Sequence, residues 1–303
     1  MGEFPGLHVH QAPETHPWLR ARAAFPRPAR GLDPSSGRYT LRVSDQPSTP
    51  RTGFLYRLYQ RRLRREIDPA RVPQHIAMIV DGNRRWAKQR LQERAAYGHR
   101  AGAQKIPELL GWCEEAGIHT VTLYLLSADN LKARDRQELD DLTGIIAELA
   151  TQLAENPRWR VKHVGSCEGL PEELSSALAA AEAATADHTG LHVNLAVGYG
   201  GRSEITAAVR SVIAEHQAAG GTIDTLDEHL TPETIGEHLW TRGQADPDLV
   251  IRTSGEQRLS DFMIWQSAHS EFYFVEALYP DLREVDFLRA LRDYSTRQRR
   301  LGG

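Results

Sequence analysis

The sequence predicts an α/β fold: a single domain with a mainly parallel sheet of about six strands, flanked by helices. Short apolar runs alternate with longer amphipathic runs along most of the chain, which is typical of strand–helix units that build a parallel sheet. The chain has 303 residues, of which 40% are hydrophobic, so it is long enough to bury a sizeable core. No internal repeat is visible, and we therefore expect one domain.

The composition argues against several classes of protein. The formal net charge is −3, so there is no general excess of positive charge for a nucleic acid, and phosphate recognition would depend on locally placed arginines. Cys113 and Cys167 stand alone without a zinc-ligand spacing, which indicates a reducing compartment. No run approaches ~18 apolar residues, and no secretory signal is recognisable. We expect a cytoplasmic protein, with peripheral membrane association left open.

The N-terminal part of the chain differs from the rest. Prolines recur through residues 1–52 without a sustained apolar period, which predicts a disordered arm. Gly53 then precedes a strongly basic segment whose apolar residues, from Leu55 to Leu63, have helical spacing. Because this segment is short, packing of the helix on the domain is favoured over a membrane-surface role. The folded domain is expected over residues 53–303.

Strands and helices then follow in regular order. Apolar runs that end at turn residues predict strands, and longer runs with a period near 3.6 predict helices. Strands are expected at 75–80, 119–127, 159–166, 191–200 and 248–255, with a final strand in the apolar segment 262–275. Helices are expected at 101–117, 136–156, 171–185, 202–220, 230–240 and 284–300. Pro107 should lie near the first turn of its helix, and Thr231 should cap a helix that begins with Pro232.

Four predicted strands end in polar or glycine-rich segments. These are "DGNRRWA" from residue 81, "SADN" from 127, "GYGGRSE" from 198 and "RTSGEQRLS" from 252. In open α/β sheets, ligands bind outside the carboxyl ends of the strands, so the four segments should converge on one rim.

The segment "DGNRRWA" favours a site for metal and phosphate. Asp81 ends a strand, Gly82 frees the backbone, and the next residues open a helix whose first N–H groups suit a phosphate. A lone carboxylate beside such a site is a candidate Mg²⁺ ligand, because magnesium commonly uses one or two carboxylates together with substrate phosphates. The alternative is an ordinary helix start beside a solvated pair of arginines.

The other strand ends narrow the chemistry. Arg252, Arg258 and Ser260 surround a Ser-Gly turn, and arginine forks suit the oxygens of a diphosphate. "GYGGR" is neither a GxGxxG nor a Walker A loop, so nucleotide binding is poorly supported, and a tight turn is an equal alternative. His99 is the one histidine near these motifs, and no GxSxG elbow of a hydrolase is present.

Together the residues predict an Mg²⁺-dependent enzyme that handles two phosphate groups at the rim of the sheet. They do not distinguish phosphoryl transfer from a reaction in which diphosphate is the leaving group. Apolar and aromatic residues near the motifs favour an apolar substrate. These residues are Trp86, Leu125, Leu126, Phe262 and Trp265.

Four blocks of the sequence resemble a known family. "HIAMIVDGNRRWA", "YGHRAG", "LAVGYGGRSEI" and "DPDLVIRTSGEQRLSDFMIWQSAHSEFYF" are similar to signature blocks of the cis-prenyltransferases, the undecaprenyl diphosphate synthase family. The resemblance implies a homodimer with an apolar tunnel beside the sheet. It also implies Mg²⁺-dependent condensation of isopentenyl diphosphate with an allylic diphosphate to form a cis double bond. The DDxxD motifs of trans-prenyltransferases are absent.

The resemblance also implies roles for individual residues. Asp81 would bind Mg²⁺, Asn83 would help proton removal, and Glu271 would contribute to metal binding, often across the dimer interface. Residues implied to bind the two diphosphate substrates are Gly82, Asn83, Arg84, Arg85, Trp86, Arg94, His99, Ser127, Asp129, Arg252, Arg258 and Ser260. An Arg-Leu-Gly element at 300–302 resembles one that some members extend to the partner subunit.

Departures from the family pattern point to one branch. Arg84 stands where the family usually has glycine, and "LSADNL" replaces a Phe-Ser-x-Glu-Asn-Trp block. Leu126 in place of the aromatic resembles the actinobacterial short-chain synthases, in which Leu125 and Leu126 would restrict chain length. The expected product is (2Z,6E)-farnesyl diphosphate from geranyl diphosphate. A longer-chain polyprenyl diphosphate synthase, a head-to-middle coupling enzyme and a non-catalytic partner subunit are the alternatives.

Overall fold

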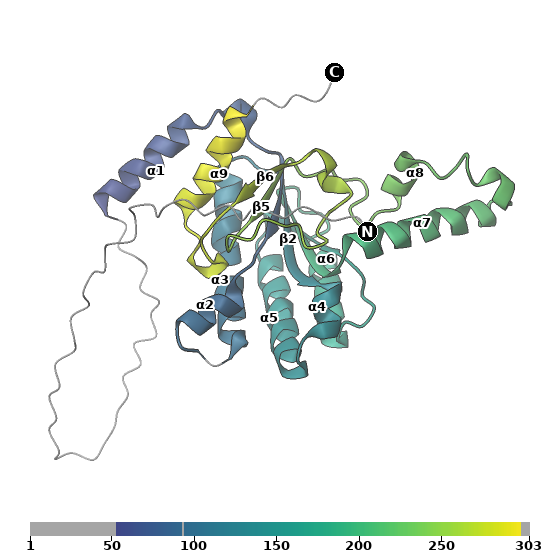
Figure 1. Cartoon of the computed structure of the whole chain (residues 1–303), viewed down its shortest axis with the longest axis horizontal. Helices are drawn as coiled ribbons and strands as arrows, with labels where there is room; N and C mark the ends of the chain where they lie inside the picture. The colour runs from purple at the N-terminus through teal and green to yellow at the C-terminus, as the bar shows by residue number, and fades with distance from the viewer. Residues whose placement is uncertain (1–52, 93, 298–303) are drawn as a thin grey trace, which may run out of the picture. The chain divides into compact units, whose positions relative to one another are not determined.

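A computed structural model describes residues 53–92 and 94–297, and within these ranges six strands form one parallel sheet. The strands lie in the order β3-β4-β2-β1-β5-β6, and every neighbouring pair is parallel (Figure 1). Their bounds are β1 His75–Ile79, β2 Thr120–Ser127, β3 Trp159–Val164, β4 Leu191–Tyr199, β5 Leu249–Arg252 and β6 Glu271–Phe274. The predicted class, strand positions and parallel pairing are confirmed. The predicted N-terminal arm and the Arg-Leu-Gly element at 300–302 lie outside the described residues.

The helices occupy the connections between the strands. They are α1 Phe54–Glu66, α2 Asn83–Gln89, α3 Ala95–Glu115, α4 Ala128–Ala133, α5 Arg136–Ala154, α6 Glu172–Ala184, α7 Gly201–Ala218, α8 Pro232–Glu237 and α9 Glu284–Thr296. Short 3-10 turns are η1 Pro69–Arg71, η2 Ile223–Thr225, η3 Gln266–His269 and η4 Tyr279–Asp281. The Thr231 hydroxyl accepts the Thr234 N–H at the start of α8, which confirms the predicted cap. The sequence did not predict α4.

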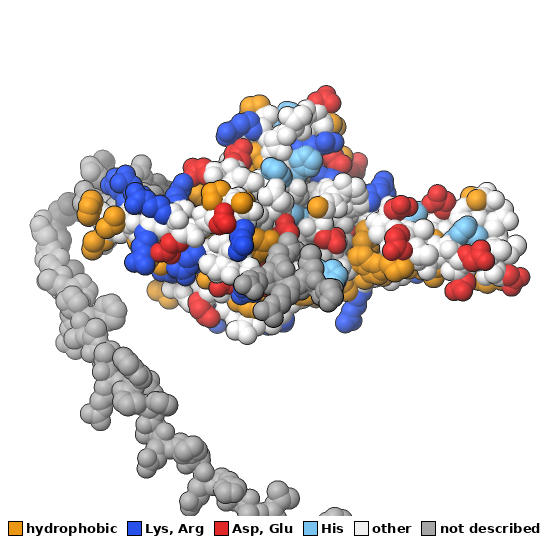
Figure 2. Space-filling view, turned by 90° about the horizontal axis from the view of Figure 1, so that it is seen from above, with side chains coloured by type: hydrophobic (Ala, Val, Ile, Leu, Met, Phe, Trp, Pro, Cys, Tyr) orange, Lys and Arg blue, Asp and Glu red, His pale blue; other side chains and the backbone are white. Residues whose placement is uncertain are grey.

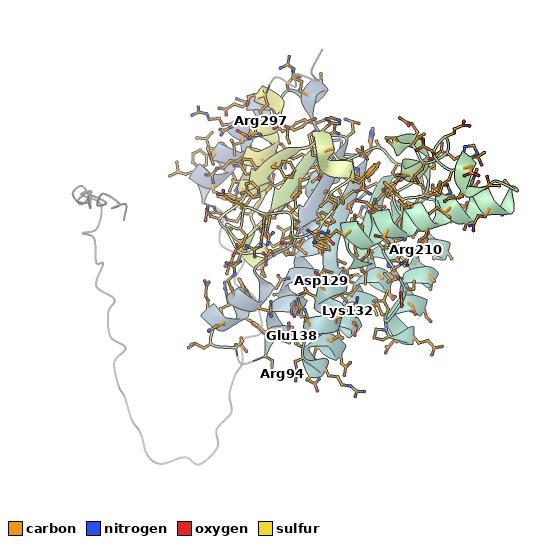
Figure 3. All side chains as sticks on the ribbon, turned by 45° about the vertical axis from the view of Figure 1, so that its right-hand side comes forward. Arg94, Asp129, Lys132, Glu138, Arg210 and Arg297 are labelled. Carbon is orange, nitrogen blue, oxygen red and sulfur yellow. The ribbon has the colours of Figure 1, made fainter. Side chains whose placement is uncertain are left out.

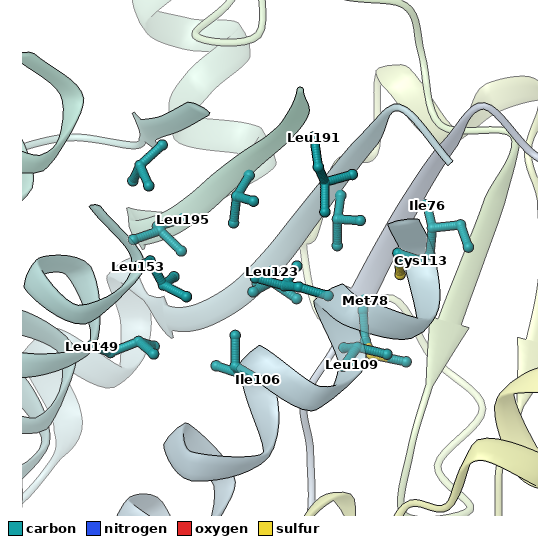
Figure 4. Close-up of a cluster of buried hydrophobic side chains, with 14 of the residues drawn as sticks. Ile76, Met78, Ile106, Leu109, Cys113, Leu123, Leu149, Leu153, Leu191 and Leu195 are labelled. Carbon is teal, nitrogen blue, oxygen red and sulfur yellow. The ribbon is translucent and has the colours of Figure 1, made fainter. Parts of the chain in front are cut away.

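The sheet separates two parts of the core. Along β1, Ile76 and Met78 point into the larger cluster, whereas Ala77 and Ile79 point into the smaller one, as the two-residue period of a strand requires. Figure 4 shows the larger cluster, where α3 and α5 cover the sheet with side chains such as Leu109. The smaller cluster includes Phe262, Met263 and the partly buried Trp240. Each fully buried side chain of this size contributes roughly 1.5–3 kcal/mol.

Helix α3 begins six residues before its predicted start, and the prediction for Pro107 is wrong. Pro107 lies inside α3, well past the first turn. A proline there removes one helical hydrogen bond and costs about 3 kcal/mol. The cost is offset because Ile106, Leu109 and Leu110 are almost fully buried against the sheet. Tertiary packing therefore carries the helix through a residue that would end it in isolation.

Helix α1 packs against α9, so the predicted packing of this helix on the domain is confirmed. Leu63 is fully buried with Val285 and Leu288 of α9, and Tyr56 and Tyr59 pack beside them. Among the described helices, none combines the length and apolar character needed to cross a membrane.

Candidate active site

A cavity of about 1090 Å³ lies at the carboxyl ends of β1, β2 and β5. The four polar strand ends all contribute residues to it, with Arg202 and Ser203 coming from the "GYGGRSE" segment. The predicted convergence on one rim is therefore confirmed. The apolar part of the wall comes mainly from α3 and α5, through Ala103, Ile106, Leu142, Ile145, Ile146 and Leu149. One end of the cavity thus suits charged groups, and the rest suits a hydrocarbon.

Thirteen of the site residues predicted from the sequence line this cavity. They are Asp81, Gly82, Asn83, Arg84, Arg85, His99, Leu125, Leu126, Ser127, Asp129, Arg252, Arg258 and Ser260. Three predicted residues, Trp86, Arg94 and Glu271, are not part of the wall.

The backbone of Asp81 is fixed by two neighbouring segments. The Asp81 N–H donates to the Thr253 hydroxyl at 2.9 Å, and that hydroxyl donates to the Asp81 carbonyl at 2.7 Å. The Tyr279 N–H also donates to this carbonyl at 3.0 Å. Gly82 follows with a φ of 104°, and a Cβ there would meet Leu278 at 2.8 Å. Only glycine fits this turn, which explains the Asp-Gly pair.

Arg252 links the two halves of the polar site. Its side chain is buried, and its guanidinium donates to the Asp81 carboxylate at 2.7 Å and to the Ser260 hydroxyl at 2.8 Å. Ser254, Ser260 and Asp261 in the following loop have φ values of 78°, 52° and 63°. Left-handed backbone is unfavourable for such residues and occurs where surrounding structure holds it, often at functional sites.

The carboxyl group of Asp81 stays ionised. Burial, the largest single influence, raises its pKa, but the hydrogen bond and charge of Arg252 outweigh it together with hydrogen bonds from Ser254 and Gly82, so the pKa is lowered. The Asp81 carboxylate is therefore available as an anion at the cavity wall. Arg85 lies 3.9 Å from the same carboxylate and donates to the Ser254 hydroxyl at 2.5 Å.

Two glycines of α3 set the position of Asn83. A Cβ on Gly98 would lie 2.0 Å from the Asn83 carbonyl oxygen, and a Cβ on Gly102 would lie 2.6 Å from its side-chain oxygen. The helix therefore packs directly on the start of α2. The close contact with Asn83 thus explains why the "YGHRAG" motif has glycine at both positions.

A cluster of charged groups borders the cavity beside His99. Glu138 of α5 accepts a hydrogen bond from Arg134, lies 3.2 Å from His99 Nε2 and lies 3.9 Å from Arg84 Nε. Burial lowers the pKa of His99 below its ordinary value of 6.5, and the charges of Arg134 and Arg84 lower it further against the opposing effect of Glu138. His99 is therefore neutral near pH 7.

The sequence analysis did not predict three residues in or beside the charged cluster near His99. Asn130 and Arg134 line the cavity, and Glu138 stands behind it. The four-residue spacing of Arg134 and Glu138 was a weak signal for a helical ion pair. The turn from α4 into α5 at Arg134 was not recognised, so the pair was not placed at the site.

Several buried polar atoms on the wall lack a partner among the described residues. They are Asn83 Oδ1, Arg134 Nε, Arg252 Nε and the Tyr279 hydroxyl. Buried polar atoms in proteins are nearly always hydrogen-bonded, so groups of this kind at a cavity are satisfied by bound water or by a polar ligand.

The two leucines at the end of β2 face the same side because the strand pairing is irregular there. Tyr124 pairs with Ala196 and Leu126 with Val197, so Leu125 is an extra residue on β2. A bulge of this kind redirects side chains. Both leucines consequently line the cavity, although consecutive strand residues normally point to opposite faces.

Trp86 and Arg94 have other contacts. Trp86 stacks on Tyr97 with ring centroids 5.7 Å apart, and the Arg90 guanidinium lies 3.9 Å from its ring. Arg94 donates to Asp141 at 2.8 Å and is largely exposed. In this structure both residues brace the elements around the cavity instead of facing it.

Glu271 lies at the other end of the sheet. It pairs with Leu249 at the amino end of β5, whereas Asp81 follows the carboxyl end of β1. It accepts a hydrogen bond from Arg297, and Figure 3 shows Arg297 above the strands and Asp129 below them. Within one chain, Asp81 and Glu271 are therefore not neighbours. Among the described residues there is also no group of three acidic, histidine or cysteine side chains placed to hold a metal ion.

Comparison with known proteins identifies the family of this chain. Residues 79–302 match the family described as "Putative undecaprenyl diphosphate synthase". The chain belongs to this family. It is a cis-prenyltransferase, and the polar and apolar parts of its cavity correspond to the two parts of an isoprenyl diphosphate.

Relatives of this cis-prenyltransferase include actinobacterial enzymes. The chain is 53% identical over 253 residues to isoprenyl transferase 2 of Tropheryma whipplei (strain Twist), covering 82% of this chain and 95% of the relative. It is 54% identical over 248 residues to (2Z,6E)-farnesyl diphosphate synthase of Thermobifida fusca (strain YX), covering 82% and 97%. It is 51% identical over 251 residues to short-chain Z-isoprenyl diphosphate synthase of Mycobacterium leprae (strain TN), covering 82% and 95%.

A solved structure has the same fold. Lavandulyl diphosphate synthase from Lavandula x intermedia, in complex with dimethylallyl diphosphate, superimposes with a TM-score of 0.70 at 34% identity. The match covers 76% of this chain and 98% of that one. The α/β fold and the family predicted from the sequence are both confirmed.

Proposed function

We propose that this cis-prenyltransferase condenses isopentenyl diphosphate with geranyl diphosphate and releases (2Z,6E)-farnesyl diphosphate after one addition. The observation that carries the proposal is the bulge in β2, which turns Leu125 and Leu126 together onto the cavity wall. Two branched side chains at one place restrict the space for a growing hydrocarbon. The names of the relatives from Thermobifida fusca and Mycobacterium leprae support the same product.

The polar end of the cavity supplies two groups of diphosphate ligands. We assign Arg252, Arg258 and Ser260 to isopentenyl diphosphate, because Arg252 ends β5, the other two lie on the loop that follows, and Arg252 donates to the Ser260 hydroxyl. The allylic diphosphate would bind Arg84 and Arg85 at the start of α2. Arginine forks suit both, since they bond two oxygens at once.

The donor set fits Mg²⁺ only together with substrate. Asp81 provides one ionised carboxylate at the cavity wall, and magnesium accepts one or two carboxylates when phosphate oxygens and water complete its shell. When bound, Mg²⁺ would supply positive charge that favours departure of the diphosphate. Arg252 would have to share the Asp81 carboxylate with the ion.

The protein's own residues would stabilise the charges that develop during the reaction. Arg84 and Arg85 would stabilise the departing diphosphate as positive charge grows on the allylic carbon. The apolar wall from α3 and α5 would exclude water from that carbon. The isopentenyl double bond then attacks the carbon, and loss of a proton gives the cis alkene. Asn83, whose side-chain oxygen is unpaired among the described residues, would assist proton removal.

We further propose a homodimer in the cytoplasm, in which Glu271 completes the site of the partner subunit. The proposal is supported by the separation of Asp81 and Glu271 within one chain. It is tested by co-expressing Asp81→Ala chains with Glu271→Ala chains. In the mixed dimer one site would keep both acids, so the mixture should recover about a quarter of wild-type activity. Each variant alone should be inactive, and a mixture that also stays inactive would contradict the shared site.

Product length is tested directly. Purified enzyme is incubated with radiolabelled isopentenyl diphosphate and either geranyl or farnesyl diphosphate, and the products are sized. One C15 product from geranyl diphosphate supports the proposal. A ladder of long products would favour the polyprenyl alternative, and no turnover in either reaction would favour a non-catalytic subunit.

A further inference from the structure

The outer face of α1 carries apolar side chains that nothing in the described part of the chain covers. Phe54, Leu55 and Leu58 are 79%, 77% and 53% exposed. They occupy the first turn and a half of the helix, on the side away from α9. Large apolar side chains gathered at this exposure mark an interaction surface.

The same face is strongly basic. Arg57, Arg61 and Arg65 are exposed and form no ion pair with any described residue. Figure 2 shows lysine and arginine side chains gathered over α1, with hydrophobic side chains beside them at its outer end. The whole chain has a net charge of −3, so this positive charge is local.

The opposite face of α1 holds the helix firmly on the domain. Leu63 is fully buried, Arg64 donates to both Glu115 and Glu284, and Gln60 donates to Glu284. The Arg289 guanidinium also lies 5.3 Å from the ring of Tyr59. These contacts fix the orientation of α1 on the domain, so its outer face always points away from α9.

We propose that this face of α1, an apolar tip formed by Phe54, Leu55 and Leu58 with arginines behind it, docks the enzyme on a membrane surface that contains anionic lipids. Apolar side chains beside arginines on a helix that lies flat suit the boundary between headgroups and acyl chains. Arginines near an anionic surface each strengthen binding about fivefold. An enzyme whose substrates and products carry a hydrocarbon chain would then work beside the phase into which these molecules partition.

A second copy of the chain fits this surface less well. A two-fold dimer through this face would place the same arginines opposite one another, and three exposed apolar side chains fall short of the roughly 1000 Å² that a stable protein interface buries. Charge complementarity therefore favours an anionic lipid surface.

The test is co-sedimentation of the full-length protein with vesicles. One set contains phosphatidylcholine alone, and the other contains phosphatidylcholine with added phosphatidylglycerol. The wild type should bind the second set at least about tenfold more tightly, and added salt should weaken the binding. No binding to the phosphatidylglycerol vesicles, or equal binding to both sets, would overturn the proposal.

Two variants separate the apolar and charged contributions. Arg57→Gln/Arg61→Gln/Arg65→Gln should bind phosphatidylglycerol vesicles on the order of 100-fold more weakly. The matched control is Arg136→Gln/Arg210→Gln/Arg242→Gln, which changes the net charge equally at exposed arginines elsewhere and should bind like the wild type. If the control variant loses as much vesicle binding as the α1 variant, the loss is explained by overall charge. That result would refute a docking face on α1.

The second variant, Phe54→Ser/Leu55→Ser/Leu58→Ser, should also lose vesicle binding while keeping its turnover of soluble geranyl diphosphate, because α1 contributes nothing to the cavity wall. Turnover thus reports that the variant is folded. Wild-type vesicle binding by this variant would overturn the proposal. A change in oligomeric state by light scattering would do so as well, since it would identify the face as a contact between subunits.

Discussion

The contact between α3 and Asn83 offers a sharp test of how the site is positioned. In Gly98→Ala, the new Cβ would lie 2.0 Å from the Asn83 carbonyl oxygen, whereas ordinary contacts begin near 3.4 Å. The start of α2 must therefore move away from α3 by on the order of 1 Å. Displacements of this size cost about 100-fold in rate when they move groups that hold a substrate.

Gly98→Ala should thus lower kcat/KM for isopentenyl diphosphate incorporation by about 100-fold. The crowding should also lower the free energy of unfolding by about 1–3 kcal/mol, partly offset by the better helix propensity of alanine. The assay is steady-state incorporation of radiolabelled isopentenyl diphosphate, with urea unfolding of the same preparations.

The control lies on the same helix. A Cβ on Gly111 of α3 would have nothing within 4 Å, so Gly111→Ala should keep wild-type kcat/KM and raise the unfolding free energy by up to about 1 kcal/mol. Wild-type activity in Gly98→Ala would refute the steric explanation. Equal losses in both variants would refute it too, because they would show that any alanine in α3 is harmful.

Three further predictions concern the charged groups and the leucines. Asp81→Asn should abolish measurable turnover and cost about 2 kcal/mol in urea unfolding, because buried Arg252 loses its carboxylate partner; near-normal turnover would contradict the metal assignment. Leu125→Ala/Leu126→Ala should give products longer than C15 in the sizing assay, and an unchanged C15 product would show that the leucines do not limit chain length. His99 has a lowered pKa in the folded state, so its contribution to stability falls as the pH drops below about 6.5. The difference in unfolding free energy between wild type and His99→Asn should therefore narrow between about pH 7 and pH 5, and a constant difference would contradict burial of a neutral His99.

The strand ends were predictable because they depend on local sequence and on a general rule of parallel sheets. An apolar run followed by Asp-Gly, or by Arg-Thr-Ser-Gly, marks the end of a buried strand in the linear sequence. The rule that such ends share one rim then places Asp81 near Arg252, and the structure joins them by a 2.7 Å hydrogen bond.

What could not be predicted depends on distances between elements. The sequence does not show that Arg94 pairs with Asp141, or that Trp86 stacks on Tyr97. Pro107 was misplaced because propensity favours a helix start, whereas the buried side chains around it extend the helix in both directions. The charged group around Glu138 forms because α3 and α5 lie side by side, and no pattern within either helix predicts that contact.

The bulge in β2 also bears on how product length could change in evolution. Leu125 is an extra residue on β2 relative to β4. The original register is restored at the Ser127–Tyr199 pair, because Gly198 is an extra residue on β4. Loss of either Leu125 or Leu126 from β2 would restore regular alternation there and leave a single leucine on the cavity wall. Relatives could therefore differ in chain length through a short deletion as well as through substitution, and an alignment that ignores gaps at this position would miss the change.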